Sequence, residues 1–82
     1  MRYDVELRPR AEKDLRNLPK QERQRVVEKL RLEGNDLHGD IKRLVQLQPS
    51  YQLRVGDYRV LFEAESDKIV VYRILHRREA YR

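Results

Sequence analysis

Two arginines face each other across a predicted β-hairpin. Residues Tyr51–Val55 and Tyr58–Glu63 are rich in β-forming residues and flank Gly56-Asp57, a pair typical of a two-residue type II′ turn. A turn of this length places Arg54 directly opposite Arg59. Because like charges in this position destabilise a sheet, an anion held between the two guanidinium groups is the simplest explanation for the pair.

The same register divides the hairpin into two faces. One face is apolar and can pack against helices: Tyr51, Leu53, Val55, Tyr58, Val60 and Phe62. Gln52, Arg54 and Arg59 then lie on the opposite, helix-free face, where we expect an exposed basic surface. The alternative is a solvated strand face whose charges are relieved by Glu63 or Asp57.

The C-terminal tail carries groups that phosphoryl chemistry can use: His76, Arg77, Arg78 and Tyr81. Histidine can donate or accept a proton near neutral pH, and arginine neutralises charge on a phosphate. Tyrosine can stack on a base or transfer a proton. These residue types point to chemistry on a nucleic-acid phosphate, although basic tails are also common on proteins with no such activity.

The length of the last turn decides which tail residue joins the paired arginines. If the turn at Ser66-Asp67 has two residues, His76 shares the face of the arginines. A loop with an odd number of residues places Arg77 there instead. The sequence leaves both possibilities open.

The first half of the chain predicts a strand and two helices. Arg2–Leu7 alternates in polarity like a half-buried strand, and Pro9 suits the first turn of a helix that Pro19 must break. A second helix is expected over Gln21–Glu33, ending at Gly34-Asn35. The apolar residues expected to be buried on these helices recur at helical spacing: Ala11, Leu15, Leu18, Val26, Val27 and Leu30.

The second half of the chain is predicted to be β-structure after a loop at Asn35–Asp40. Ile41–Leu47 is a short strand or an extended entry into the sheet, and Lys68–His76 is the last strand. The predicted fold class is α+β, with an N-terminal strand, a helical hairpin and then an antiparallel sheet of three to four strands packed against the helices. With 82 residues, the chain is expected to form a single domain over residues 1–82.

Composition narrows the chemistry. The chain has no cysteine and two histidines, so we expect neither disulfides, nor a histidine metal cage, nor a cofactor. Without a signal peptide or an apolar run long enough to span a bilayer, it is expected to be soluble and cytoplasmic. The 19 basic residues outnumber 14 acidic ones and give a net charge of +5, which favours a polyanionic partner over a neutral one. A plain solvated surface is the competing interpretation.

The hairpin and tail together resemble a known family. The segment from Leu53 to the C-terminus reads LRVGDYRVLFEAESDKIVVYRILHRREAYR and is similar to the RelE branch of the RelE/ParE toxin superfamily. Upstream, PRAEKDLRNLP and GDIKRL are similar to the same family. The resemblance implies a RelE-like fold and a microbial toxin that cleaves mRNA in the ribosomal A site, by metal-free attack of the RNA 2′-hydroxyl, and that an acidic antitoxin protein holds inactive.

The resemblance also implies roles for individual residues. The residues assigned to catalysis by it are Arg54, Arg59, His76, Arg77 and Tyr81. Those assigned to substrate binding are Lys42, Arg43, Gln52 and Arg78. Gln52 stands where relatives carry a lysine, so the proton transfers are expected to fall to His76 or Tyr81, since arginine is a poor base.

Two other functions are compatible with parts of this pattern. A ParE-type toxin would inhibit DNA gyrase without nuclease chemistry, but such proteins generally lack the combined arginines, HRR tail and tyrosine. A non-catalytic RNA-binding module would use the basic face without cutting. The sequence favours the ribosome-dependent nuclease.

Overall fold

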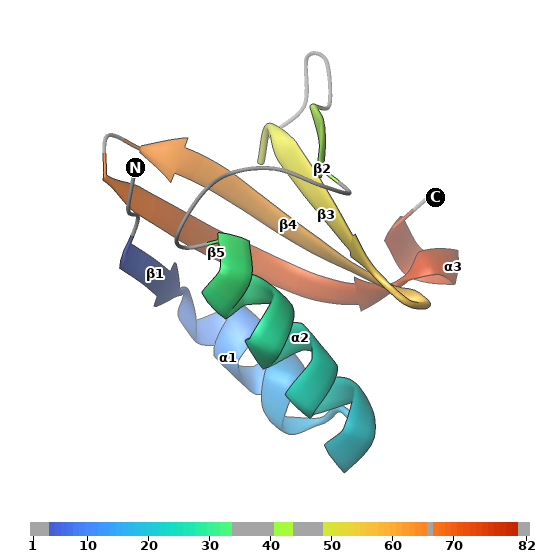
Figure 1. Ribbon diagram of the computed structural model, residues 1–82. Helices are drawn as coiled ribbons and strands as arrows, with labels where there is room; N and C mark the ends of the chain where they lie inside the picture. The colour runs from blue at the N-terminus through green and yellow to red at the C-terminus, as the bar shows by residue number, and fades with distance from the viewer. Residues whose placement is uncertain (1–3, 34–40, 44–48, 66, 81–82) are drawn as a thin grey trace.

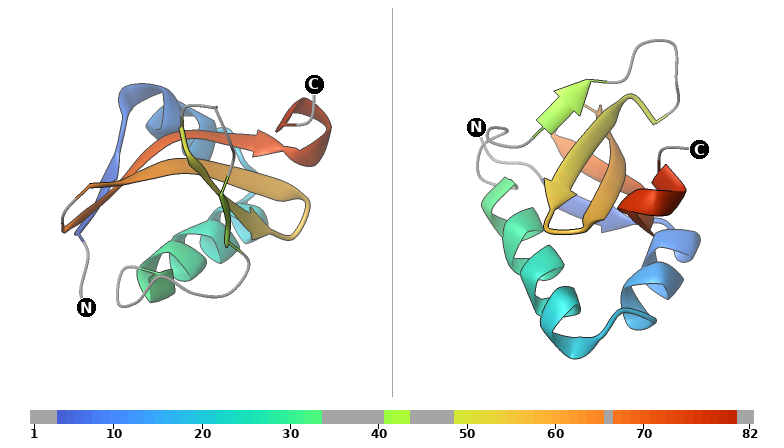
Figure 2. Two further views of the ribbon diagram at one scale, coloured as in Figure 1. Left: turned by 90° about the horizontal axis from the view of Figure 1, so that it is seen from above. Right: turned by 90° about the vertical axis from the view of Figure 1, so that its right-hand side faces the viewer.

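A mixed five-stranded sheet carries two helices on one side. The computed structural model describes residues 4–33, 41–43, 49–65 and 67–80. Its elements follow the order β1 (Asp4–Leu7), α1 (Pro9–Arg16), α2 (Lys20–Glu33), β2 (Ile41–Arg43), β3 (Tyr51–Val55), β4 (Tyr58–Glu65), β5 (Lys68–His76) and α3 (Arg77–Ala80). Figure 1 and the right-hand view of Figure 2 show α1 and α2 below the sheet and α3 at the end of β5.

The strands are ordered β1-β5-β4-β3-β2. The last four strands, β2 to β5, form an antiparallel meander in which each strand pairs with the next one along the chain. β1 pairs in parallel with the other edge of β5. A parallel pair needs a long crossover, and α1 and α2 begin that connection. The predicted α+β fold is confirmed, with the N-terminal strand completing the sheet at the edge formed by β5.

The helix boundaries follow their proline residues. Pro9 occupies the first turn of α1, where its missing N–H costs no hydrogen bond, and Pro19 separates α1 from α2. The expected C-cap at Gly34-Asn35 and the loop up to Asp40 lie outside the described residues, as do residues 44–48 of the expected entry segment. Among the described residues no helix is long and apolar enough to cross a membrane.

The core lies between the helices and the apolar face of the sheet. Buried side chains of the core come from both helices and three strands: Ala11, Val26, Leu30, Leu53, Val55, Val60, Phe62, Ile69, Val71 and Ile74. Leu15 and Leu18 are partly buried against them. Val27 was expected in this core but is 38% exposed, because α2 turns Val26 and Leu30 inward and Val27 lies beside that stripe.

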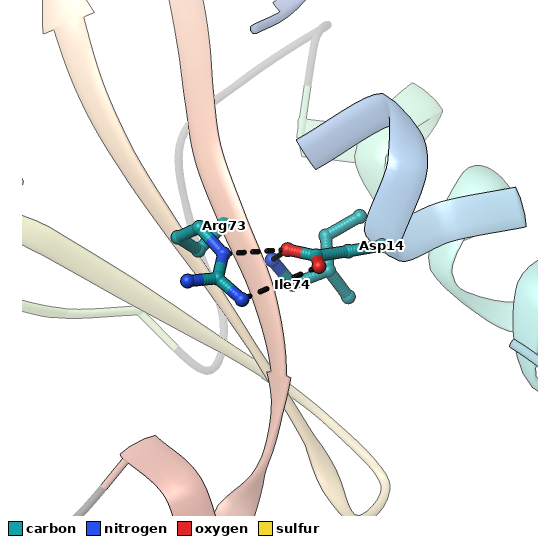
Figure 3. Close-up of polar contacts among 3 residues, drawn as sticks. All are labelled: Asp14, Arg73 and Ile74. Carbon is teal, nitrogen blue, oxygen red and sulfur yellow. Dashed lines mark hydrogen bonds and ion pairs between the residues drawn. The ribbon is translucent and has the colours of Figure 1, made fainter. Parts of the chain in front are cut away.

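Asp14 ties α1 to the last strand. Its Oδ2 accepts hydrogen bonds from Arg73 Nε at 2.8 Å and from the Ile74 N–H at 3.0 Å (Figure 3). The β1 pairing covers β5 only as far as Val71, so the carboxylate takes over a backbone donor on the strand edge that β1 leaves open. Burial would raise the pKa of Asp14, but the bonds from Arg73 and Ile74 and the nearby arginine charges lower it below its usual value.

The Asp14 contact predicts a pH-dependent contribution to stability. Asp14→Asn should lower the free energy of unfolding by about 1 to 2 kcal/mol at pH 7, because the charged bond to Arg73 is lost. Since the folded pKa is depressed, this contribution is present above pH of about 4 and disappears as the pH falls through the folded value. Urea unfolding at pH 7 and pH 3 should show that the difference in free energy of unfolding between wild type and Asp14→Asn is smaller at pH 3.

Glu12→Gln on the exposed side of α1 is the matched control. It should change stability by less than about 0.5 kcal/mol at pH 7. An Asp14→Asn protein as stable as wild type at pH 7, or a deficit that grows towards pH 3, would contradict this account of the contact.

Candidate nucleic-acid interface at the hairpin end

The hairpin forms with the predicted register. Gly56 has a φ of 58°, a left-handed value that favours glycine, and the turn pairs Val55 with Tyr58. Arg54 is the strand partner of Arg59, as predicted. The sequence therefore predicts the backbone of this end of the sheet correctly.

The side chains differ from the expected exposed face. Arg54 is exposed, but Arg59 is only 7% exposed and Gln52 only 4%. The Arg59 Nη1 donates to the Gly56 carbonyl at 3.1 Å and to the Tyr58 carbonyl at 3.0 Å. Arg59 thus folds back over the turn, and two carbonyl oxygens stabilise the charge for which the sequence analysis expected either an anion or a nearby carboxylate.

Glu63 was the expected alternative source of charge relief, and the structure gives it another bond. Its Oε1 accepts a hydrogen bond from the Ser50 N–H at 2.5 Å. Asp57, the other candidate, does lie beside the arginines. The turn carbonyls bonded to Arg59 therefore supply charge relief that neither interpretation of the paired arginines included, and an anion between the arginines stays a prediction.

An irregularity in β5 decides which tail residue reaches the arginines. Glu65 pairs with Lys68, so the turn has the two residues that were expected to place His76 on the arginine face. Further along, Phe62 pairs with Val71 but Leu61 pairs with Arg73, which makes Tyr72 an extra residue. The extra residue reverses the alternation along the rest of β5.

His76 consequently lies on the opposite face from the one expected. It pairs with Tyr58, and the two rings meet edge to face with centroids 5.5 Å apart. Its Nδ1 accepts a hydrogen bond of 3.3 Å from the Arg78 N–H. His76 therefore acts as an N-terminal cap for α3, a structural role that the sequence analysis did not assign.

The bulge brings Arg77 to the arginines in place of His76. The Arg77 N–H donates to the Asp57 carbonyl at 2.7 Å, which fixes the start of α3 beside the hairpin turn (Figure 1). The side chain of Arg77 lines the same hollow as those of Arg54 and Arg59. Three of the residues predicted to be catalytic are thus gathered at one place.

This hollow is open and has a volume of about 630 Å³. Its lining residues come from the hairpin, α2 and α3: Arg25, Glu28, Lys29, Arg54, Val55, Gly56, Asp57, Arg59 and Arg77. Five basic and two acidic side chains leave a formal excess of three positive charges. Such a surface attracts polyanions and favours phosphate, which the guanidinium fork can contact with two hydrogen bonds.

The contribution of α2 was missed by the sequence analysis. Arg25 and Lys29 are one helical turn apart and flank the buried stripe of Val26 and Leu30. That spacing was the available signal, because residues beside a core stripe must emerge at the margin of the sheet that the helix covers. The sequence alone does not show at which edge of the sheet Arg25 and Lys29 emerge, because that depends on how α2 packs against the strands.

The remaining predicted site residues are placed less closely. Lys42 and Arg43 lie in β2, where Lys42 is the strand partner of Gln52, and Arg78 is an exposed residue of α3. Tyr81 lies outside the described residues. Among the described residues no group of three or more histidine, cysteine or acidic side chains could hold a metal ion.

The buried position of Arg59 changes its expected effect on stability. Arg59→Ala should lower the free energy of unfolding by about 2 kcal/mol, because two carbonyls lose a charged donor. Relief of like-charge strain alone predicts the reverse. Chemical denaturation decides, with Arg54→Ala on the opposite strand as the matched control, expected to stay within about 0.5 kcal/mol of wild type. An Arg59→Ala protein at least as stable as wild type would contradict the turn contact.

Comparison with known proteins agrees with this architecture. A family model described as the ParE toxin of the type II toxin-antitoxin system parDE matches residues 5–81. Toxin RelE3 of Methanocaldococcus jannaschii is 38% identical over 76 residues, which cover 84% of this chain and 84% of that protein.

Solved structures of toxin-antitoxin complexes contain similar chains. A RelB-RelE antitoxin-toxin complex from Methanococcus jannaschii matches with a TM-score of 0.74 and 31% identity over 94% of this chain and 95% of that one. An archaeal RelE-RelB complex from Pyrococcus horikoshii OT3 matches with a TM-score of 0.80 and 25% identity, covering 94% of this chain and 97% of that one. The chain therefore belongs to the RelE/ParE family of toxins from type II toxin-antitoxin systems.

Proposed function

We propose that this toxin is an endoribonuclease that cleaves mRNA in the ribosomal A site. The observation that carries the proposal is the hollow where Arg54, Arg59 and Arg77 meet at the end of the hairpin. Phosphoryl transfer needs little covalent chemistry from the protein but needs positive charge placed where negative charge develops. A site built from three guanidinium groups supplies that charge.

The proposed reaction is an internal transesterification. The ribose 2′-oxygen attacks the adjacent phosphorus, the bond from phosphorus to the 5′-oxygen breaks, and a 2′,3′-cyclic phosphate and a 5′-hydroxyl are formed. One proton leaves the 2′-hydroxyl and another reaches the departing 5′-oxygen, so the reaction consumes no water. Arg54 and Arg77 are both exposed and would contact the phosphate oxygens. Arg59 would hold the turn through its bond to the Gly56 carbonyl and add positive charge to the site without being exposed.

The proton transfers are assigned to the tail. His76 lies on the opposite face of β5 from the arginines and its Nδ1 accepts the Arg78 N–H, so its position favours capping of α3 over proton donation to the 5′-oxygen. Tyr81 remains the proposed group for stacking on a base or for assisting proton transfer. Gln52 is buried, so a lysine in its place would have to reach out of the sheet to add charge to the site.

The proposal predicts a large loss of cleavage from a surface substitution. Arg54→Gln should slow single-turnover cleavage of ribosome-bound mRNA by about 10² to 10³-fold, since it removes a charge aimed at the transition state. Stability should change by less than about 0.5 kcal/mol because Arg54 is exposed. Primer extension on translated mRNA measures the cleavage.

Two further variants sharpen the same assay. Arg16→Gln makes the same charge change on an exposed position of α1 and should cleave like wild type. His76→Asn keeps an acceptor for the Arg78 N–H but cannot transfer a proton near neutral pH, so we expect a wild-type rate, which restricts His76 to capping α3. A slow His76→Asn enzyme would instead give His76 a part in the proton transfer. Wild-type toxin that leaves mRNA intact while inhibiting DNA gyrase, or that binds RNA without cutting it, would overturn the nuclease proposal.

We also propose that an acidic antitoxin segment covers this basic face. The support is the net charge of +5 together with the two similar chains solved in RelB-RelE complexes. Binding of such a segment depends on charge contacts that salt screens.

The antitoxin proposal predicts a salt-dependent affinity for the protein that co-purifies with the toxin. The dissociation constant should rise several-fold between 0.1 and 0.5 M NaCl, and Arg54→Gln should flatten this dependence while Arg16→Gln leaves it unchanged. A basic partner, or an affinity indifferent to salt, would contradict the proposal.

A further inference from the structure

The α2 side of the hollow carries cations that the proposed reaction does not use. Val26 and Leu30 point into the core, which fixes the rotation of α2 and leaves Arg25 and Lys29 at its margin. Both line the hollow, and the right-hand view of Figure 2 shows α2 and α3 on either side of the hairpin end. The hollow is therefore broader than a site for a single phosphate requires.

Arg25 is held against the hairpin turn. Atoms of its guanidinium lie 3.2 to 3.3 Å from the point where a side chain at Gly56 would place its Cβ. Glu22, one turn earlier on α2, lies 3.7 Å from Arg25 Nη1. The Arg25 side chain is nevertheless 59% exposed, so an incoming ligand can reach it without displacing the core.

We propose that Arg25 and Lys29 form a second phosphate subsite, which binds a backbone phosphate next to the scissile one. This inference deepens the proposed nuclease function and rests on it. A strand whose scissile phosphate lies at Arg54 and Arg77 carries a further charge at every nucleotide, so its neighbouring phosphate must leave the hollow over one of its walls. The α2 wall offers a guanidinium already positioned by the turn, which lowers the conformational cost of the contact.

A polynucleotide suits these two subsites better than an acidic peptide. Its phosphates have a regular spacing, and the cations of α2 and of the hairpin are held by separate rigid elements. Glu28 and Asp57 also line the hollow, so an anion is bound only where the positive charges nearby exceed the repulsion from these carboxylates. An acidic peptide is the competing ligand that the experiment must exclude.

The test measures binding of uncleavable strands to the full chain. Fluorescence anisotropy is recorded with 2′-deoxy oligonucleotides of two, four and eight residues, over a series of salt concentrations, for wild type and for Arg25→Gln/Lys29→Gln. The double variant should bind the four- and eight-residue strands about three- to tenfold more weakly, and its salt slope should be shallower by about 0.7, the change expected for one lost phosphate contact. The dinucleotide, with one phosphate, should bind both proteins equally.

Arg31→Gln is the control, because Arg31 is an exposed residue of α2 that does not line the hollow. An equal loss in this control, an equal loss for the dinucleotide, or no loss at any length would overturn the second subsite. A double variant that binds a glutamate-rich peptide more weakly but binds oligonucleotides normally would also overturn it, in favour of a protein ligand.

Cleavage measured in parallel keeps the two proposals separate. If the double variant binds the longer strands more weakly than wild type but wild-type toxin leaves ribosome-bound mRNA intact, the nuclease function is overturned and the subsite is retained. A toxin that cleaves mRNA, with a double variant that binds every strand like wild type, would retain the nuclease and overturn the subsite.

Discussion

The irregular pairing between β4 and β5 is the constraint on which the site depends. Because Tyr72 is an extra residue, His76 lies beside its strand partner Tyr58 on one face of the sheet. Arg77 then follows at the hairpin turn, where its N–H donates to the Asp57 carbonyl. Arg8 lies over the Tyr72 ring at 5.6 Å, so the bulge is also supported from the segment that joins β1 to α1. A regular strand would exchange the positions of an imidazole and a guanidinium, and with them the chemistry available at the hairpin end.

Two further contacts hold the elements that meet there. Asp14 secures α1 to the open edge of β5 just before the strand reaches the hairpin turn, and Arg59 braces the turn itself from a nearly buried position. Both are charged groups that bond to backbone atoms, and Asp14 also bonds to the Arg73 side chain. Asp14 and Arg59 thus stabilise the elements that carry Arg54 and Arg77 on the surface. In this small domain, the charged residues that stabilise the fold differ from the exposed ones proposed to bind phosphate.

Much of this arrangement could be predicted from the sequence, because local rules determine it. Pro9 and Pro19 set the helices, and Gly56-Asp57 sets the hairpin register and the pairing of Arg54 with Arg59. The face of His76 could not be predicted, because a bulge depends on pairing between strands and leaves no mark in the alternation of Lys68–His76. Burial of Arg59 and the approach of Arg25 to Gly56 were missed for a related reason, since long side chains bend toward partners that only the tertiary structure supplies.

We propose that the arginine hollow promotes attack by the RNA 2′-oxygen on the neighbouring phosphorus. The most direct measurement compares ribosome-bound mRNA with the same mRNA carrying a single 2′-deoxynucleotide at the cleavage position, and identifies the chemical ends of the products. We predict that the unmodified mRNA yields a 2′,3′-cyclic phosphate and a 5′-hydroxyl, and that the deoxy-substituted mRNA stays intact at that position. Cleavage of the deoxy-substituted mRNA at the same position, or products that carry a 5′-phosphate, would contradict the mechanism.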